Sequence, residues 1–401
     1  MNNLTYKYLP RLDGVSAAEL GRLFPEPSIT APLMSLLQES GIDGFDLASI
    51  VVLKDGVPVL LLPIFETRLD LSSFVPGRIK TVLKTAGRLL PSIFRPSILG
   101  VGMVEGEWSE IGVDPCLDED GLDRAMKVAI DALNLLAAER ASDIIVFYNY
   151  NEYSRLPGVV FKIFNRVHYR ACTRLQIDFS GMEEYLRSLS RAARKDLHRT
   201  MLVAPEVRIL RSSMVRPFLD RIYEIYLKTV ARCPSALGRH NPLFFEKFCE
   251  RIPDAEYTLY FVREELVAFN LLVVKQEALA DQFFCMDYEL GRRYFLDVLS
   301  WLENIRTCLE RKIPLLYAGQ GSEKTKTHLG AKLIPSFILF KHRWNILDRI
   351  LAGQSAVMNK GLNYLRFCPD ASSGAPNQPV PSPREGRPCP DKRPDRAQIP
   401  Q

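Results

Sequence analysis

The predicted elements follow the same order in the two halves of this chain. In each half, β-rich runs that form a meander are followed by an amphipathic helix and then by a short apolar run typical of a buried strand. The helix and the strand span 120–140 and 142–150 in the first half, and 290–312 and 313–319 in the second. This alternation predicts an α/β fold with a mixed sheet in each half.

The length of 401 residues exceeds that of one typical domain and favours two. We place the first domain at residues 1–168 and the second at 169–345, followed by a C-terminal helix at 346–368. The last 33 residues, 369–401, include nine prolines. Such a segment buries too little apolar surface to offset its ordering entropy, so we expect a disordered tail.

Local patterns predict individual turns, helices and strands. Asp55 and Gly56 separate two β-rich runs, and an Asp-Gly pair in that position is a strong signal for a tight hairpin turn. Other patterns predict a second turn at Glu264-Glu265, helices at 82–90 and 182–202, and a closing strand at 332–342.

Composition excludes several classes of protein. The net charge of +5 is compatible with an anionic ligand but is far from that of a dedicated nucleic-acid binder. The eight cysteines show no CxxC spacing, so we expect no metal site and no disulfide framework, and reduced core thiols instead. No apolar run approaches about 20 residues, and the N-terminus lacks the pattern of a signal peptide, so we expect no membrane span and a cytoplasmic protein.

Residues 317–333, YAGQGSEKTKTHLGAKL, combine a strand, a glycine-rich break and a lysine-bearing helix. Backbone N–H groups at Gly319, Gly321 and the start of a helix form a ready site for an anion. Lys326, on the first turns of that helix, is placed to reach a phosphate or an oxyanion. The alternative is a glycine-capped helix with a solvated lysine pair, Lys324 and Lys326.

A basic stripe on the helix predicted at 182–202 is a second candidate for anion binding. Arg194 and Lys195 belong to it, and like charges at helical spacing favour a counter-anion. Together with Arg292 and Arg293 they could form one phosphate-binding surface. The alternative is an ordinary solvated face of a helix.

Three stretches of the second half resemble the BioF2-like and FemAB-like (peptidoglycan-bridge-like) families of the GNAT acyltransferase superfamily. They are EEYLRSLSRAARKDLHRT, LVAFNLLVVK with FCMDYEL, and YAGQGSEKTKTHLGAKLIPSFILFKHR. The resemblance covers roughly residues 170–343 and extends more weakly to the first half. It implies tandem GNAT-like domains and a lysine near the site of acyl transfer, and Lys326 fits the family's lysine spacing.

The resemblance implies an N-acyltransferase that transfers an acyl group to an amine acceptor by direct attack. Acyl-CoA is the first candidate for the donor, although the glycine motif that binds CoA in classical GNAT enzymes is replaced here by DYELGRRYFL. Aminoacyl-tRNA is the second candidate, and a non-catalytic binding module with an acyltransferase fold is the third reading. No metal is expected.

Acyl transfer to an amine requires removal of a proton from the amine and stabilisation of the tetrahedral oxyanion. Candidate bases are Asp287, Glu289 and Glu323, and Tyr288 is a candidate proton donor. Asp287 and Tyr288 follow a predicted central strand, and sites of α/β proteins usually lie at strand ends.

Overall fold

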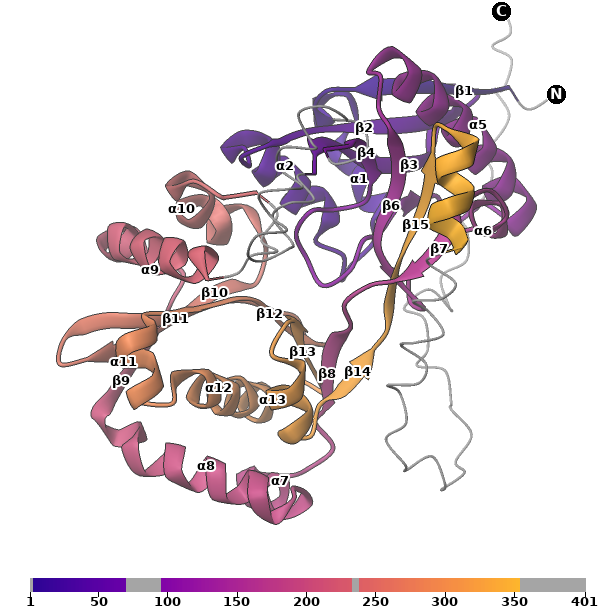
Figure 1. Ribbon diagram of the computed structural model, residues 1–401. Helices are drawn as coiled ribbons and strands as arrows, with labels where there is room; N and C mark the ends of the chain where they lie inside the picture. The colour runs from indigo at the N-terminus through magenta and orange to yellow at the C-terminus, as the bar shows by residue number, and fades with distance from the viewer. Residues whose placement is uncertain (1–2, 70–94, 233–237, 354–401) are drawn as a thin grey trace, which may run out of the picture.

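The hairpin predicted at Asp55 and Gly56 forms the centre of the first sheet. The computed structural model describes residues 3–69, 95–232 and 238–353 (Figure 1). Strands β2 (Phe45–Lys54) and β3 (Val57–Arg68) are antiparallel and are joined by Asp55 and Gly56, whose φ angles are 50° and 82°. Positive φ at both turn positions matches the right-handed twist of the strands, which confirms the predicted turn.

The first sheet has the order β1-β2-β3-β4-β6-β15-β7, with β5 paired to β3. Its strands are mixed in direction, because β4 and β6 are parallel whereas the other pairs are antiparallel. The elements of this half are β1 (Leu4–Leu9), α1 (Ala17–Leu23), α2 (Thr30–Ser40), β4 (Ser97–Val101), β5 (Gly112–Val113), α5 (Glu119–Glu139), β6 (Ile144–Asn151), α6 (Gly158–Ile163) and β7 (Asn165–His168).

The second sheet has the order β14-β8-β13-β12-β11-β10-β9 and repeats the plan of the first. A meander of three antiparallel strands leads through a helix to a strand parallel to the last of them. The elements of this half of the chain are β8 (Cys172–Gln176), α7 (Met182–Ser188), α8 (Arg191–Val203), β9 (Val207–Ser212), α9 (Leu219–Ala231), α10 (Pro242–Arg251), β10 (Ala255–Val262), β11 (Glu265–Val274), β12 (Leu279–Met286), α11 (Tyr288–Arg293), α12 (Leu296–Arg311), β13 (Leu315–Gln320), α13 (Glu323–His328), β14 (Lys332–Ile334) and, in the first sheet, β15 (Ser336–His342).

The two long helices predicted in the second half are each broken into two. Helix 182–202 stops at Ser188 and restarts at Arg191, because the Ser190 side chain accepts a hydrogen bond from the Ala193 N–H and caps a new helix. Helix 290–312 is interrupted at Phe295, which has a φ of 50°. Apolar periodicity continued through both breaks and therefore did not reveal them. The turn between β10 and β11 lies at Arg263-Glu264, one residue earlier than predicted.

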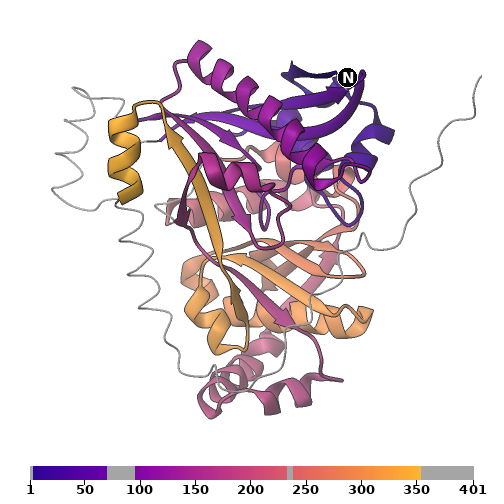
Figure 2. The same ribbon diagram turned by 90° about the vertical axis from the view of Figure 1, so that its right-hand side faces the viewer.

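The strand predicted at 332–342 is divided between the two sheets. β14 pairs with β8 in the second sheet, whereas β15 pairs with β6 and β7 in the first. Figure 2 shows this segment running from one sheet to the other. Pro335 stands between the two strands and has no N–H to donate to a ladder, which suits the change of sheet. The first sheet thus includes a strand from beyond the predicted boundary at residue 168.

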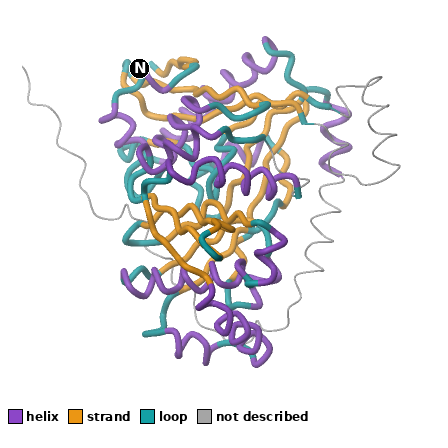
Figure 3. The backbone as a smooth tube through the Cα atoms, turned by 90° about the vertical axis from the view of Figure 1, so that its left-hand side faces the viewer, coloured by secondary structure: helices purple, strands orange, loops and turns teal. Residues whose placement is uncertain are grey.

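Helices α1, α2, α9 and α10 lie between the sheets and bury apolar side chains of both halves in one cluster. Leu36 and Val51 of the first half and Phe245 and Phe269 of the second belong to it. The outer face of the first sheet is covered by α5, and that of the second by α12 with α7 and α8. Figure 3 shows the strands between these layers of helices. The shared cluster holds the two halves together.

Several predictions concern residues at the edges of the described structure. Residues 345–353 are helical, while the rest of the predicted C-terminal helix, the predicted tail and the predicted helix at 82–90 lie outside the described residues. Within the described ranges no helix is both long and apolar enough to cross a bilayer. Cys172, Cys285 and Cys308 are free thiols buried in the core, as expected for most of the cysteines, whereas Cys116 is disulfide-bonded.

Candidate active site

The parallel strands β12 and β13 separate soon after they begin. They pair only at Leu279 with Leu316 and at Ala280 with Tyr317, whereas the equivalent strands of the first half, β4 and β6, stay paired over four positions. A bulge in β12 leaves Gln282 without a partner on β11, two residues after the last position at which β12 pairs with β13. An extra residue in one strand bends it and ends regular pairing. The second sheet therefore has an opening between β12 and β13.

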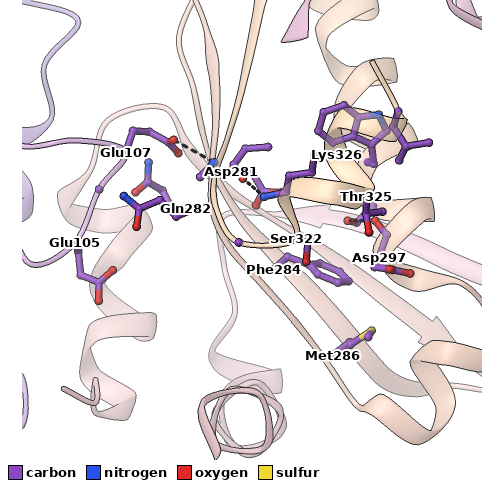
Figure 4. A pocket seen from close by; sticks show the side chains of 18 of the residues that line it. Glu105, Glu107, Asp281, Gln282, Phe284, Met286, Asp297, Ser322, Thr325 and Lys326 are labelled. Carbon is purple, nitrogen blue, oxygen red and sulfur yellow. Dashed lines mark hydrogen bonds between the residues drawn. The ribbon is translucent and has the colours of Figure 1, made fainter. Parts of the chain in front are cut away.

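A cavity of about 530 Å³ lies at this opening and is lined by both halves of the chain (Figure 4). One wall comes from the loop after β4, including Glu105 and Glu107, and from Asn149 at the end of β6. The opposite wall includes Asp297 at the start of α12, and Lys326 of α13 lies between the two. The walls of the cavity therefore come from both faces of the second sheet.

The loop after β4 is fixed in place by backbone contacts to β6. Gly102 has a φ of 122°, and a Cβ there would lie 2.9 Å from the Tyr148 carbonyl oxygen, so this position requires glycine. The Ser109 N–H donates to the Asn149 carbonyl oxygen at 2.7 Å. These contacts hold Glu105 and Glu107 against the second half.

Lys326 lies at the centre of a group of buried charges. Its ammonium donates to the carbonyl oxygen of Ala318 on β13. Burial lowers the pKa of Lys326, and the nearby carboxylates of Asp281 and Glu107 oppose that shift. Lys326 thus lies beside the carboxyl groups of Asp281 and Glu107 inside the opening.

Asp281 is held by side-chain amides. Asn270 Nδ2 donates to both of its carboxylate oxygens at 3.0 and 2.9 Å, and Asn304 Nδ2 donates at 2.9 Å. Asn270 in turn accepts a hydrogen bond from the Tyr260 hydroxyl at 2.8 Å. Burial raises the pKa of Asp281 to about 6, against the effect of the amide donors and of Lys326. Asp281 is therefore ionised at neutral pH and fixed in orientation.

Glu107 occupies part of the anion site that the sequence predicted. Its Oε2 accepts from the Gly319 N–H at 3.1 Å, so the protein's own carboxylate takes the backbone donor that was expected to bind an external anion. Burial raises the pKa of Glu107 to about 8, while Lys326 lowers it and Asp281 raises it further. A carboxyl group with such a pKa can exchange a proton near neutral pH.

The structure brings about half of the predicted site residues to the cavity. Five of them line it: Lys326, Tyr288, Arg292, Gly319 and Gly321. The other six are not among the residues that line it: Asp287, Glu289, Glu323, Arg293, Arg194 and Lys195.

Asp287 and Arg194 have structural contacts that account for their positions. Asp287 accepts from the Glu289 N–H at the start of α11 and from Lys228 at 2.8 Å, and the hydrogen bond from Lys228 lowers its pKa. Arg194 donates to the Leu189 carbonyl oxygen at 2.7 Å, at the break between α7 and α8. A capping, ion-paired carboxylate with a lowered pKa is a poor proton acceptor.

Sequence reasoning missed Glu105, Glu107 and Asp281. Asp281 carried a signal, because a carboxylate inside an otherwise apolar strand is rarely buried without a partner or a function. The two glutamates carried none, since they lie in a loop of the other half. In the described part of the chain no group of three or more His, Cys, Asp or Glu side chains is arranged to hold a metal.

Comparison with solved structures identifies the fold. No protein-family model matches the chain, and no curated protein matches its sequence. The C-terminal domain of a putative lysylphosphatidylglycerol synthetase from Agrobacterium fabrum aligns over 87% of this chain and 97% of its own, with 11% identity and a TM-score of 0.51. FemX aligns over 84% of this chain and 97% of its own, with 11% identity and a TM-score of 0.51.

A tandem GNAT protein from the clavulanic acid biosynthesis pathway aligns over 85% of this chain, with 11% identity and a TM-score of 0.49. At such identities a structural likeness shows the fold alone. The chain therefore shares its fold with the Agrobacterium domain and FemX, and its two mixed sheets with flanking helices confirm the predicted α/β class.

Proposed function

We propose that this protein is an N-acyltransferase that transfers an acyl group to an amine by direct attack. The observation that supports the proposal is the cavity at the opening between β12 and β13, in which Lys326 faces the carboxylates of Asp281 and Glu107. The opening has a wall on each face of the second sheet, so donor and acceptor can meet there without a covalent enzyme intermediate.

The three charged side chains supply what the reaction needs. The acceptor binds as an ammonium ion and must lose a proton before its nitrogen attacks the acyl carbonyl carbon. Glu107 and Asp281 are the proton acceptors in this proposal, because their raised pKa values, about 8 and about 6, lie close to neutral pH. Lys326 stabilises the oxyanion of the tetrahedral intermediate. Collapse of this intermediate breaks the bond to the leaving group.

Acyl-CoA is the proposed donor, and the α12 side of the cavity is its proposed entry. Arg292 lines the cavity there and carries the positive charge that suits a phosphate-bearing donor. The new bond is an amide, and the broken bond is the thioester C–S bond. The proton that leaves the amine passes to the carboxylates, and the CoA thiolate takes up a proton on release.

An aminoacyl donor carried by tRNA is the second candidate. Two observations favour it: one similar structure is named a putative lysylphosphatidylglycerol synthetase, a name that denotes a lysyl product, and the carboxylates of the cavity can receive the α-ammonium of an aminoacyl group. In this case the broken bond is an ester C–O bond, and the roles of the three side chains are unchanged. We also propose that the chain belongs to the BioF2-like or FemAB-like branch of the GNAT superfamily.

The experiment is a product search by mass spectrometry with two donor arms. One arm supplies acetyl-CoA and longer acyl-CoA thioesters, and the other supplies aminoacyl-tRNA, each with a panel of primary amines. We expect an amide product in one arm, and its loss in Lys326→Met but not in Lys324→Met. Absence of product in both arms, together with no change in melting temperature on addition of either donor, would favour a non-catalytic binding module instead.

A further inference from the structure

Glu105 lines the cavity and forms no ion pair with a lysine or arginine in the described part of the chain. Its side chain is 23% exposed, and its one ion-pairing contact among the described residues is with His240, whose Nε2 lies 2.8 Å from Glu105 Oε1. Figure 4 shows Glu105 on the side of the cavity opposite Asp297 and Thr325. Lys326 acts on Glu107 and Asp281, so those two carboxylates already have a shared counter-charge.

The ring of His240, which contacts Glu105, is buried among aromatic side chains. The ring is 1% exposed and is stacked on Phe244 at 3.9 Å between centroids, with the edge of Phe283 also in contact. Its Nδ1 is buried and has no hydrogen-bond partner within the described structure. A doubly protonated ring would place an unpaired N–H there, which is costly. Among the described residues Glu105 has no lysine or arginine partner, and its contact with a titratable side chain is through the His240 ring.

We propose that Glu105 binds a second cationic group of the acceptor, so that the acceptor class is a short diamine. This inference rests on the proposed function and adds a specificity-determining residue to it. Glu105 and Glu107 are two positions apart, so their Cα atoms are at most about 7 Å apart. A diamine of a few carbons can therefore place one ammonium at Glu105 and bring the other to the carboxylates beside Lys326.

Calorimetry without any donor tests the inference separately from catalysis. The probes are 1,4-diaminobutane and butylamine, which have the same carbon chain and differ by one ammonium. We expect the diamine to bind the wild-type protein about tenfold to a hundredfold more tightly, the range of a hydrogen bond to a charged group. In Glu105→Gln the ratio should fall towards one. Glu264→Gln is the matched control, because Glu264 is an exposed residue paired with Arg208 outside the cavity.

Each outcome has a distinct meaning. Equal binding of the two amines to the wild-type protein, or an unchanged ratio in Glu105→Gln, overturns the second cation subsite even if acyl transfer is observed. A strong preference for the diamine without transfer to any amine overturns the proposed function and leaves the subsite in place. Nitrogen NMR of the His240 ring is the second measurement: a doubly protonated ring in the free protein would supply the missing counter-charge and contradict the inference.

Discussion

Replacing Lys326 with methionine tests the candidate site through both stability and activity. Methionine keeps most of the length of the side chain and removes the ammonium. The substitution takes the donor from the Ala318 carbonyl oxygen and the counter-charge from Asp281 and Glu107. The sequence suggested a lysine on a helix surface, which could be replaced at little cost. The structure places the side chain among carboxylates, so its loss should also affect folding.

The cost at pH 8 follows from these contacts. An acceptor left without its donor costs about 1–3 kcal/mol, and breaking a fully buried ion pair costs about 3–5 kcal/mol. Lys326 lines a cavity rather than a dry core, and the carboxylates can take up protons, so the lower part of the range applies. We expect Lys326→Met to lower the free energy of unfolding by about 2 kcal/mol at pH 8, within the usual range for the loss of one buried contact.

The cost should shrink as the pH falls. Glu107 has a pKa of about 8 and Asp281 one of about 6, so both carboxylates become neutral between pH 8 and pH 5. The attraction between Lys326 and these groups then disappears in the wild-type protein, and the methionine variant loses less by comparison. Activity should fall about a hundred- to a thousandfold at pH 8, the usual effect of removing one oxyanion contact.

The assay is denaturant unfolding at pH 8 and pH 5 with turnover measured at pH 8, and Lys324→Met is the control. Lys324 is exposed and lies two positions away, roughly 200° around the helix. Lys324→Met should change the free energy of unfolding by no more than about 0.5 kcal/mol and the turnover by no more than a factor of about two. A destabilisation of Lys326→Met that grows as the pH falls, or equal effects of the two variants, would refute the reasoning.

Three further predictions concern single contacts. The folded wild-type protein holds the proton of Glu107 more tightly than the unfolded chain does, so its free energy of unfolding falls as the pH rises from about 4.5 to about 8. Glu107→Gln has no such proton to lose, so its stability relative to the wild type should rise over the same pH range. Melting curves of both proteins across this range would show the difference. Asn270→Ala should move the acidic limb of the pH–rate profile to higher pH, because Asn270 favours the ionised form of Asp281; an unmoved limb would exclude Asp281 as the base. Ser190→Ala should cost about 1 kcal/mol in unfolding experiments through loss of the α8 cap, and no loss would mean that packing alone sets the break between α7 and α8.

Features that depend on neighbouring residues were readable from the sequence. The Asp55-Gly56 turn follows from the φ angles that this dipeptide tolerates, and helix α5 follows from its apolar stripe. The repeated order of meander, helix and strand was sufficient to predict a mixed α/β fold in each half. Lys326 was predicted because it follows the glycine-rich break on the next helix and fits the lysine spacing of the family that the segment resembles.

Features that depend on contacts between distant segments were decided by the tertiary structure. Periodicity shows that a face is buried but not what covers it, so the passage of β15 into the first sheet could not be predicted. The residues next to Glu107 in the sequence do not indicate its role. Its carboxylate accepts a hydrogen bond from the Gly319 N–H, 212 positions away in the sequence, and only folding brings the loop after β4 to that donor. The charge environment of Lys326, which decides what the lysine can do, is therefore a property of the fold and not of the segment that contains it.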